Sequence, residues 1–300
     1  MATSSHELRA RLVDYAWSAW SCLGVAGWSK SSFAGCIDID ALVLMTGRLG
    51  DTDARLRDES IDWCVSNIAL VARSRLAHLL RGDETNPSWA AYAATLQSAT
   101  KQRWPGAGTA FDWTASRKSR VPDRADGSTL ALRCRALLGA TARGEVVRIL
   151  LLEEGNRALD ARDLAVEAAY TKRSISEALE NLRIAGLVVA TSAGNSLRFH
   201  FQRRVEIEAL LGPLPEIRTS QRAFCRVLWA ILRASEEAAD TSARIRLVEG
   251  ARLVRELEPE MRRIDPDAVV LGGEPPSLDV LLDWCIATFD AHFGAGLPPH

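Results

Sequence analysis

Apolar residues recur at helical spacing through the first and last thirds of the chain. Leu8, Leu12, Tyr15 and Ala19, for example, fall on one face of a helix. The same spacing predicts helices near 8–19, 41–49, 54–80, 220–238, 241–257 and 278–293. The chain is therefore expected to be mainly α-helical.

The middle of the chain predicts a closer succession of short helices. Two are expected over 130–138 and 142–154, and Asp160 is well placed to cap a third. A fourth begins after Thr171, a second capping residue, and ends before Gly186. Its apolar stripe consists of Ile175, Ala178, Leu179 and Leu182. One face of this last helix is therefore expected to be buried and the other exposed.

A β-hairpin is predicted directly after this helix. Residues 187–190 are strand-like, 192–195 are typical of a turn, and 196–202 alternate strictly between apolar and polar. The second strand then carries Leu197, Phe199 and Phe201 on one face and Arg198 and His200 on the other.

The segment LDARDLAVEAAYTKRSISEALENLRIAGLV (159–188), with the hairpin after it, resembles the winged helix-turn-helix of ArsR- and MarR-type bacterial transcription regulators. The resemblance covers about a quarter of the chain. It implies a DNA-binding fold and dimerisation. The cysteine and histidine motifs of ArsR-type metal sensors have no counterpart here, so neither a metal nor a cofactor is expected.

The resemblance also implies which residues contact duplex DNA. The major-groove residues would be Thr171, Lys172, Arg173, Ser174 and Ser176. Asn195, Arg198 and His200 would lie along the backbone or the minor groove. Arg173 is the candidate for a bidentate contact with guanine. Weaker candidates for phosphate contact are Arg133, Arg135, Arg143, Arg203 and Arg204.

Proline- and glycine-rich stretches suggest where the domains meet. The expected division is an N-terminal helical domain 1–103, a linker 104–128, the winged helix-turn-helix domain 129–204, a linker 205–218 and a C-terminal helical region 219–300 that could mediate dimerisation. The fold class is thus mainly α, with a small hairpin wing and helical flanks.

Charge and cysteine usage refine this expectation. Residues 126–204 carry a net charge of +3 and residues 205–300 one of −6, although the whole chain is at −1. A local basic surface fits this better than a wholly basic protein. The six cysteines show no CxxC spacing and stand beside apolar residues, which predicts buried thiols in a reducing cytoplasm. No signal peptide and no membrane span are expected.

Asp38 and Asp40 admit two interpretations. Their spacing is like that of the paired carboxylates of metal-dependent nucleotidyltransferases, but the adjacent Gly-Ser or Gly-Gly of that family is missing. The alternative is that one of them caps the helix over 41–49, and the sequence favours this alternative.

Taken together, the sequence predicts a sequence-specific, duplex DNA-binding transcriptional regulator. A homodimeric repressor located in the cytoplasm is expected, not an enzyme. A small-molecule effector or a protein partner could act through the helical flanks. The alternative is an antitoxin or adaptor whose winged helix and helical flanks bind a protein. Glu177 and Glu180 on the fourth helix count modestly against close contact with phosphates, but they could instead orient Arg173 or accept from a cytosine amine. A nucleotidyltransferase is the remote alternative.

Overall fold

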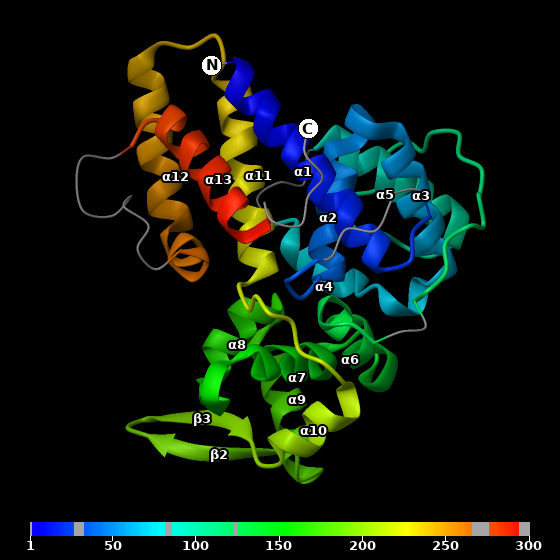
Figure 1. The fold of residues 1–300 in the computed structure, drawn as a ribbon, viewed down its shortest axis with the longest axis vertical. Coiled ribbons are helices and arrows are strands. Elements are labelled where there is room, and N and C mark those ends of the chain that lie inside the picture. Colours follow the sequence, from blue (N-terminus) through cyan, green and yellow to red (C-terminus); the bar gives the residue numbers. More distant parts are fainter. Residues whose placement is uncertain (1, 27–32, 82–85, 123–124, 266–275, 294–300) are drawn as a thin grey trace.

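The computed structural model describes residues 2–26, 33–81, 86–122, 125–265 and 276–293. This part of the chain is mainly helical, with one small antiparallel sheet (Figure 1). The helices are α1 (Ala2–Cys22), α2 (Ile39–Leu49), α3 (Ala54–Ser66), α4 (Arg73–Leu79), α5 (Pro87–Thr100), α6 (Leu130–Leu138), α7 (Ala142–Leu152), α8 (Ala161–Ala168), α9 (Lys172–Ile184), α10 (Arg204–Leu211), α11 (Gln221–Glu237), α12 (Ala243–Ile264) and α13 (Leu278–Phe293). The strands are β1 (Leu159–Asp160), β2 (Val188–Ala193) and β3 (Ser196–Phe201).

The helices of the first and last thirds of the chain pack around one shared core. We name the helices α1–α5 and α11–α13 the helical body; it forms the upper part of Figure 1. Its buried apolar side chains, from Leu8 to Phe293, form one continuous cluster. Tyr15 of α1 lies at an aromatic centre, in ring contact with Phe224 of α11 and with Phe289 and Phe293 of α13. Residues far apart in sequence therefore share this core.

The middle of the chain forms a second unit with its own core. We name α6–α10 and the three strands the sheet unit; it lies below the helical body in Figure 1. Helices α7, α8 and α9 pack on one another, and α9 also contacts β2. The strand order is β1-β3-β2, with Leu159 opposite Phe199 and Val188 opposite Phe201. Val188 and Phe201 are buried, so the base of the hairpin belongs to this core.

Several predicted elements are confirmed closely. Helix α6 covers the predicted range, and Asp38, Asp160 and Thr171 each accept hydrogen bonds from the first turn of the helix that follows. The six cysteines form no disulfide; five are buried, and Cys22 is half-buried. None of the helices in the described residues combines the length and the apolar character that a membrane span needs.

Other predicted elements differ from the structure. The two-stranded wing is a three-stranded sheet, because Leu159 and Asp160 pair with β3 before α8 begins. The single helix predicted over 54–80 is two helices. Asn67 donates its side-chain N–H to the carbonyl oxygen of Trp63 at the end of α3, and Val71 is extended before α4.

The two expected linkers also differ from simple connections. The stretch 104–122 has no regular secondary structure, but it is tied to the helical body: Phe111 N donates to Thr95 Oγ1 and Arg120 N to the carbonyl oxygen of Gly24. The first half of the expected linker 205–218 lies within helix α10, which ends at Leu211. Ile207 and Leu211 are buried, which explains why this stretch is helical.

Candidate functional site

Helix α9 separates its apolar and polar residues sharply. Thr171 has extended backbone, and its Oγ1 accepts a hydrogen bond from Ser174 N at 3.1 Å, so the first turn is capped. The apolar stripe over 175–182 is buried against α7 and α8. Gly186 ends the helix with a φ of +70°, a conformation that glycine adopts without strain and that turns the chain into β2.

The opposite face of α9 is polar and exposed. The side chain of Arg173 is 88% exposed, and its Nε donates to Glu177 Oε1 at 3.0 Å. Lys172 and Ser176 are also exposed, and Ser174 is half-buried beside Thr171. An ion pair this exposed contributes at most about 1 kcal/mol. Arg173 can therefore exchange Glu177 for another anionic or hydrogen-bonding partner at small cost.

The hairpin carries the remaining predicted contact residues. Asn195 lies exposed in the turn, and Arg198 is exposed on β3, opposite Asp160 of β1. The pKa of Asp160 is lowered, chiefly by the backbone N–H of Asp163, with a smaller effect of the Arg198 charge. His200 is only half-buried on the same strand, closer to the core. The three side chains thus extend from the tip of the hairpin toward its base.

The predicted residues form two groups, not one. Thr171, Lys172, Arg173, Ser174 and Ser176 lie in the first part of α9, whereas Asn195, Arg198 and His200 lie on the hairpin. Among the described residues, no hydrogen bond or ion pair joins the two groups. The packing of α9 against β2 holds the two elements that carry these groups side by side.

The turn between α8 and α9 is docked on the helical body. Arg75 of α4 donates its Nε–H to the carbonyl oxygen of Ala168, the last residue of α8, at 2.6 Å. Arg75 is fully buried. The start of α9 is therefore held in a defined position relative to the helical body.

Arg75 belongs to a buried cluster of three arginines and three carboxylates. Its members are Asp38, Asp40, Arg75, Arg135, Glu145 and Arg148. Arg75 contacts both Asp38 oxygens at 2.5 and 2.6 Å, and Arg135 bridges Asp40 at 2.6 Å and Glu145 at 2.8 Å. Asp38, Asp40 and Arg75 come from the helical body, the others from α6 and α7. The cluster therefore joins the two units.

The arginines keep the buried carboxylates ionised. Burial alone would raise the pKa of Asp38, but the charges of Arg75 and Arg148 outweigh it and hold that pKa well below its usual range. Burial is likewise outweighed at Glu145, whose pKa is lowered to about 2. Removing one member of such a buried network leaves its partners without compensation and is strongly destabilising.

These contacts decide between the two interpretations of Asp38 and Asp40. Asp38 Oδ1 accepts from Ala41 N at 3.2 Å, so the capping interpretation is confirmed. Asp40 accepts from Ala72 N and from two arginines, and both carboxylates are buried. Arginines of the protein itself neutralise both carboxylates, and the residues around them begin helix α2. This geometry therefore gives no support to a nucleotidyltransferase. No cluster of three or more potential metal ligands occurs among the described residues.

Three of the weaker phosphate candidates have structural partners instead. Arg135 is 2% exposed and belongs to the buried cluster. Arg133 donates to the carbonyl oxygens of Leu211 and Pro213, and Arg204 to those of Leu150 and Leu151. Arg143 and Arg203 remain exposed. The sequence could not separate these cases, because the partners lie up to 95 residues away.

Comparison with protein-family models, with curated proteins and with solved structures gives no match for this chain.

Proposed function

We propose that this protein is a regulator that binds duplex DNA through the exposed face of α9 and through the β2–β3 hairpin. The observation that carries the proposal is the division of α9, with its apolar stripe buried and Lys172, Arg173 and Ser176 exposed near its capped start. A helix that reads the major groove needs this division.

The order of elements around α9 supports the proposal. Helices α7, α8 and α9 pack together, and α9 leads directly into an antiparallel hairpin whose tip is exposed. This order is the one expected of a winged helix-turn-helix. Strand β1, which the sequence did not predict, anchors the hairpin at Phe199 and so favours a rigid position for Arg198.

Two features support different roles for the two groups of residues. Arg173 has the length and planar guanidinium for a bidentate contact with a guanine edge. Asn195 and Arg198 lie on an extended hairpin, which suits contacts with the phosphate backbone. The homodimeric and repressor character expected from the sequence stays a prediction.

The proposal is tested by selecting duplexes from a random pool with the full chain and measuring affinity for the selected sequence. Binding should weaken steeply as salt is raised, because phosphate contacts release counterions. Arg173→Ala should reduce discrimination against a changed guanine by about 1–3 kcal/mol, measured by fluorescence anisotropy with matched and mismatched duplexes.

The matched control is Arg183→Ala. Arg183 is an exposed arginine in the last turn of α9, paired with Glu180 as Arg173 is with Glu177. This variant should keep the wild-type sequence preference. The proposal fails if no duplex binds in a salt-sensitive way; Arg173 loses its reading role if both variants keep the same preference.

Exposed apolar side chains favour a second candidate, in which the sheet unit binds protein. Ile184, Val205 and Leu210 are 72%, 75% and 69% exposed. Apolar residues this exposed can form a contact with a second copy or with a partner. A partner protein that copurifies in a fixed ratio, together with no affinity for duplex DNA, would favour this candidate.

A further inference from the structure

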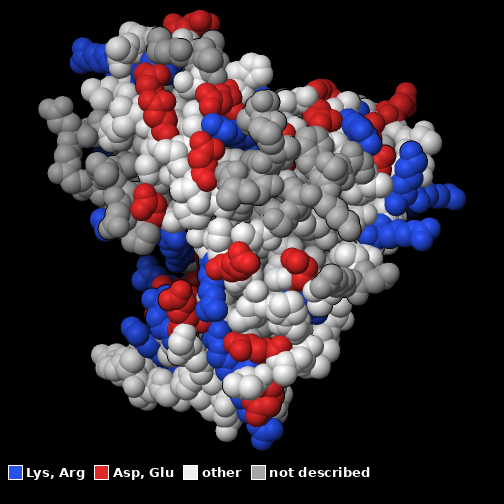
Figure 2. All heavy atoms as spheres, viewed as in Figure 1, with Lys and Arg blue, Asp and Glu red and all other residues white. Residues whose placement is uncertain are grey.

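A cleft of about 450 Å³ opens where the helical body meets the sheet unit. Its walls come from α2, α4, α8, α11 and α12, and it reaches Tyr170 and Lys172 at the start of α9. Figure 2 shows basic side chains gathered around a hollow at this junction. The volume falls within the range of small-molecule sites, roughly 300–1,000 Å³.

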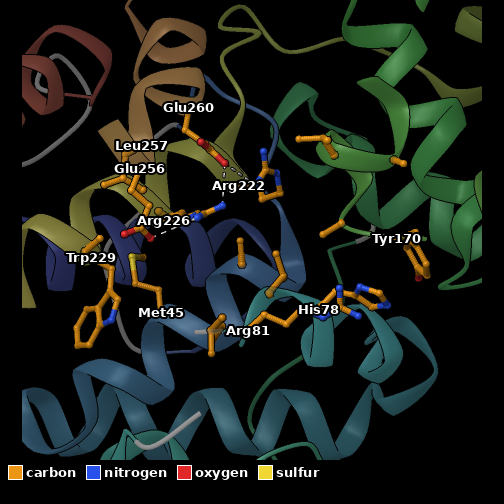
Figure 3. A pocket seen from close by; sticks show the side chains of 18 of the residues that line it. Met45, His78, Arg81, Tyr170, Arg222, Arg226, Trp229, Glu256, Leu257 and Glu260 are labelled. Carbon is orange, nitrogen blue, oxygen red and sulfur yellow. Dashed lines mark hydrogen bonds and ion pairs between the residues drawn. The ribbon is translucent and has the colours of Figure 1, made fainter. Parts of the chain in front are cut away.

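The lining combines positive charge with apolar surface. Among the described residues that line it, seven are Arg or Lys and two are acidic: Arg48, Arg81, Arg162, Lys172, Arg222, Arg226 and Arg233 against Glu256 and Glu260. Leu44, Met45, Val166, Trp229 and Leu257 supply apolar area. In Figure 3, Arg226, Glu256 and Glu260 meet on one side, with His78 and Tyr170 on the other. Such a lining suits a molecule that is both anionic and partly apolar.

Arg222 of α11 is a buried cation whose hydrogen bonding is incomplete. It is 5% exposed and lines the cleft, yet its Nε and Nη2 hydrogens have no hydrogen-bond partner among the described residues. Its nearest carboxylates, Glu167 and Glu260, are 3.6 Å away. A buried guanidinium left with unsatisfied N–H groups is costly, unless an acceptor is provided.

The two carboxylates near Arg222 are already engaged by closer partners. Glu260 accepts from Arg226 at 2.8 Å, and Glu167 accepts from Ser220 at 2.5 Å and from Arg263 at 3.2 Å. Burial lowers the pKa of Arg222 despite these charges, which is the direction expected of a cation with too little compensation. An acceptor from outside the chain would complete its hydrogen bonding.

We propose that this cleft binds a small organic anion, whose charged oxygens accept hydrogen bonds from Arg222 and whose apolar part lies against Met45, Trp229 and Leu257. The anionic group can be a carboxylate, a sulfonate or a phosphate, since each presents oxygens that a guanidinium recognises. Arg162 and Lys172 line the cleft, are exposed and add positive charge; neither forms an ion pair with any described residue.

Occupation of the cleft should also weaken DNA binding, and this step rests on the proposed function. Lys172 lines the cleft and is at the same time a candidate for major-groove contact. An anion bound beside it offsets the positive charge that would attract phosphates. The two ligands then oppose each other, and the coupling is reciprocal.

The binding test uses two fluorescent probes of similar shape. Anilinonaphthalenesulfonate is an organic anion with an apolar body, and phenylnaphthylamine is its neutral counterpart without the sulfonate. The folded wild-type chain should bind the anionic probe at one saturable site, and about tenfold or more tightly than the neutral one, because of the charge-assisted hydrogen bonds. Equal affinity for both probes, or no saturable binding, would overturn the proposal.

Variants assign the site. Arg222→Met should weaken binding of the anionic probe by about tenfold or more and leave the neutral probe unchanged. Arg262→Met removes an exposed arginine of α12 outside the cleft and should change neither. Ala230→Leu adds volume to the wall of the cleft and should weaken the binding of both probes. This second variant still tests the site if Arg222→Met does not fold. Unchanged binding in Arg222→Met or in Ala230→Leu would contradict the assignment.

A last measurement separates this proposal from the proposed function. Saturating anilinonaphthalenesulfonate should raise the Kd of the wild-type chain for its selected duplex about fivefold or more. If no duplex binds while the probes discriminate as expected, the proposed function fails and the anion site stands. If a duplex binds with the same affinity with and without the probe, the coupling is wrong.

Discussion

Arginine has two opposite roles in this molecule, and burial separates them. Arg75 is fully buried and contacts Asp38, Asp40 and the carbonyl oxygen of Ala168, whereas Arg173 is 88% exposed with one exchangeable partner. The first holds structure together. The second is available to a ligand, which is what the proposed DNA contact requires.

Removal of Arg75 should therefore be strongly destabilising. Arg75→Met leaves Asp38 and Asp40 buried with fewer cations and frees the carbonyl of Ala168. We expect the free energy of unfolding to fall by about 3–5 kcal/mol, measured by urea denaturation at neutral pH.

An exposed ion pair provides the control for this prediction. Arg157 is 69% exposed and pairs with Glu153. Arg157→Gln should reduce the free energy of unfolding by less than about 1 kcal/mol. If Arg75→Met cost no more than Arg157→Gln, the cluster would not contribute as described.

At the scale of elements, the buried cluster joins α2 and α4 to α6 and α7, and it makes the stability of this packing depend on pH. The pKa of Glu145 is about 2 in the folded chain against an ordinary value of 4.5. Stability from this group is complete above pH 4.5 and is lost as the pH falls toward 2, because the unfolded chain takes up the proton first. Asp38, whose pKa is also lowered, acts in the same direction.

The free energy of unfolding should therefore decline steeply between about pH 4.5 and 2. Glu145→Gln should make this decline shallower in urea denaturation series, and Glu154→Gln, at an exposed position, should leave it unchanged. The same slope in Glu145→Gln and the wild-type chain would show that Glu145 does not carry the effect.

The elements predicted correctly are those defined by local pattern. Thr171 as a cap, the apolar stripe from Ile175 to Leu182 and the stop at Gly186 are all short-range features, and α9 follows from them. Strand β1 has only two residues, and it forms because β3 lies beside it. No local sequence pattern therefore predicts it. Helix α10 depends in the same way on burial of Ile207 and Leu211 against other elements.

The candidate site on α9 could be predicted because its residues are close together in the sequence, whereas those of the cleft are not. The polar face of α9 could be read from residues 171–177 alone. The surroundings of Arg222 come from α2, α4, α8 and α12, which are spread over the chain from residue 39 to residue 264. The buried cluster likewise joins Asp40 to Arg135 across 95 residues. Only the folded chain brings such groups together.

At the scale of the whole molecule, the first and last thirds form one helical body that carries the sheet unit at its lower end (Figure 1). Two polar places between the units lie next to α9: the buried cluster, in which Arg75 holds the turn before α9, and the cleft, which reaches Lys172. The helical body therefore contacts the proposed DNA-binding surface at the start of α9, and an anion bound in the cleft would lie beside this point.

The central claim is that α9 and the hairpin form the surface that meets a duplex. Amide hydrogen exchange of the full chain, with and without the selected duplex, tests it most directly. The account predicts slower exchange over residues 171–184 and 188–201 when the duplex is bound, with α1 and α5 unchanged. Slower exchange confined to the helical body, or no change over either segment, would contradict it.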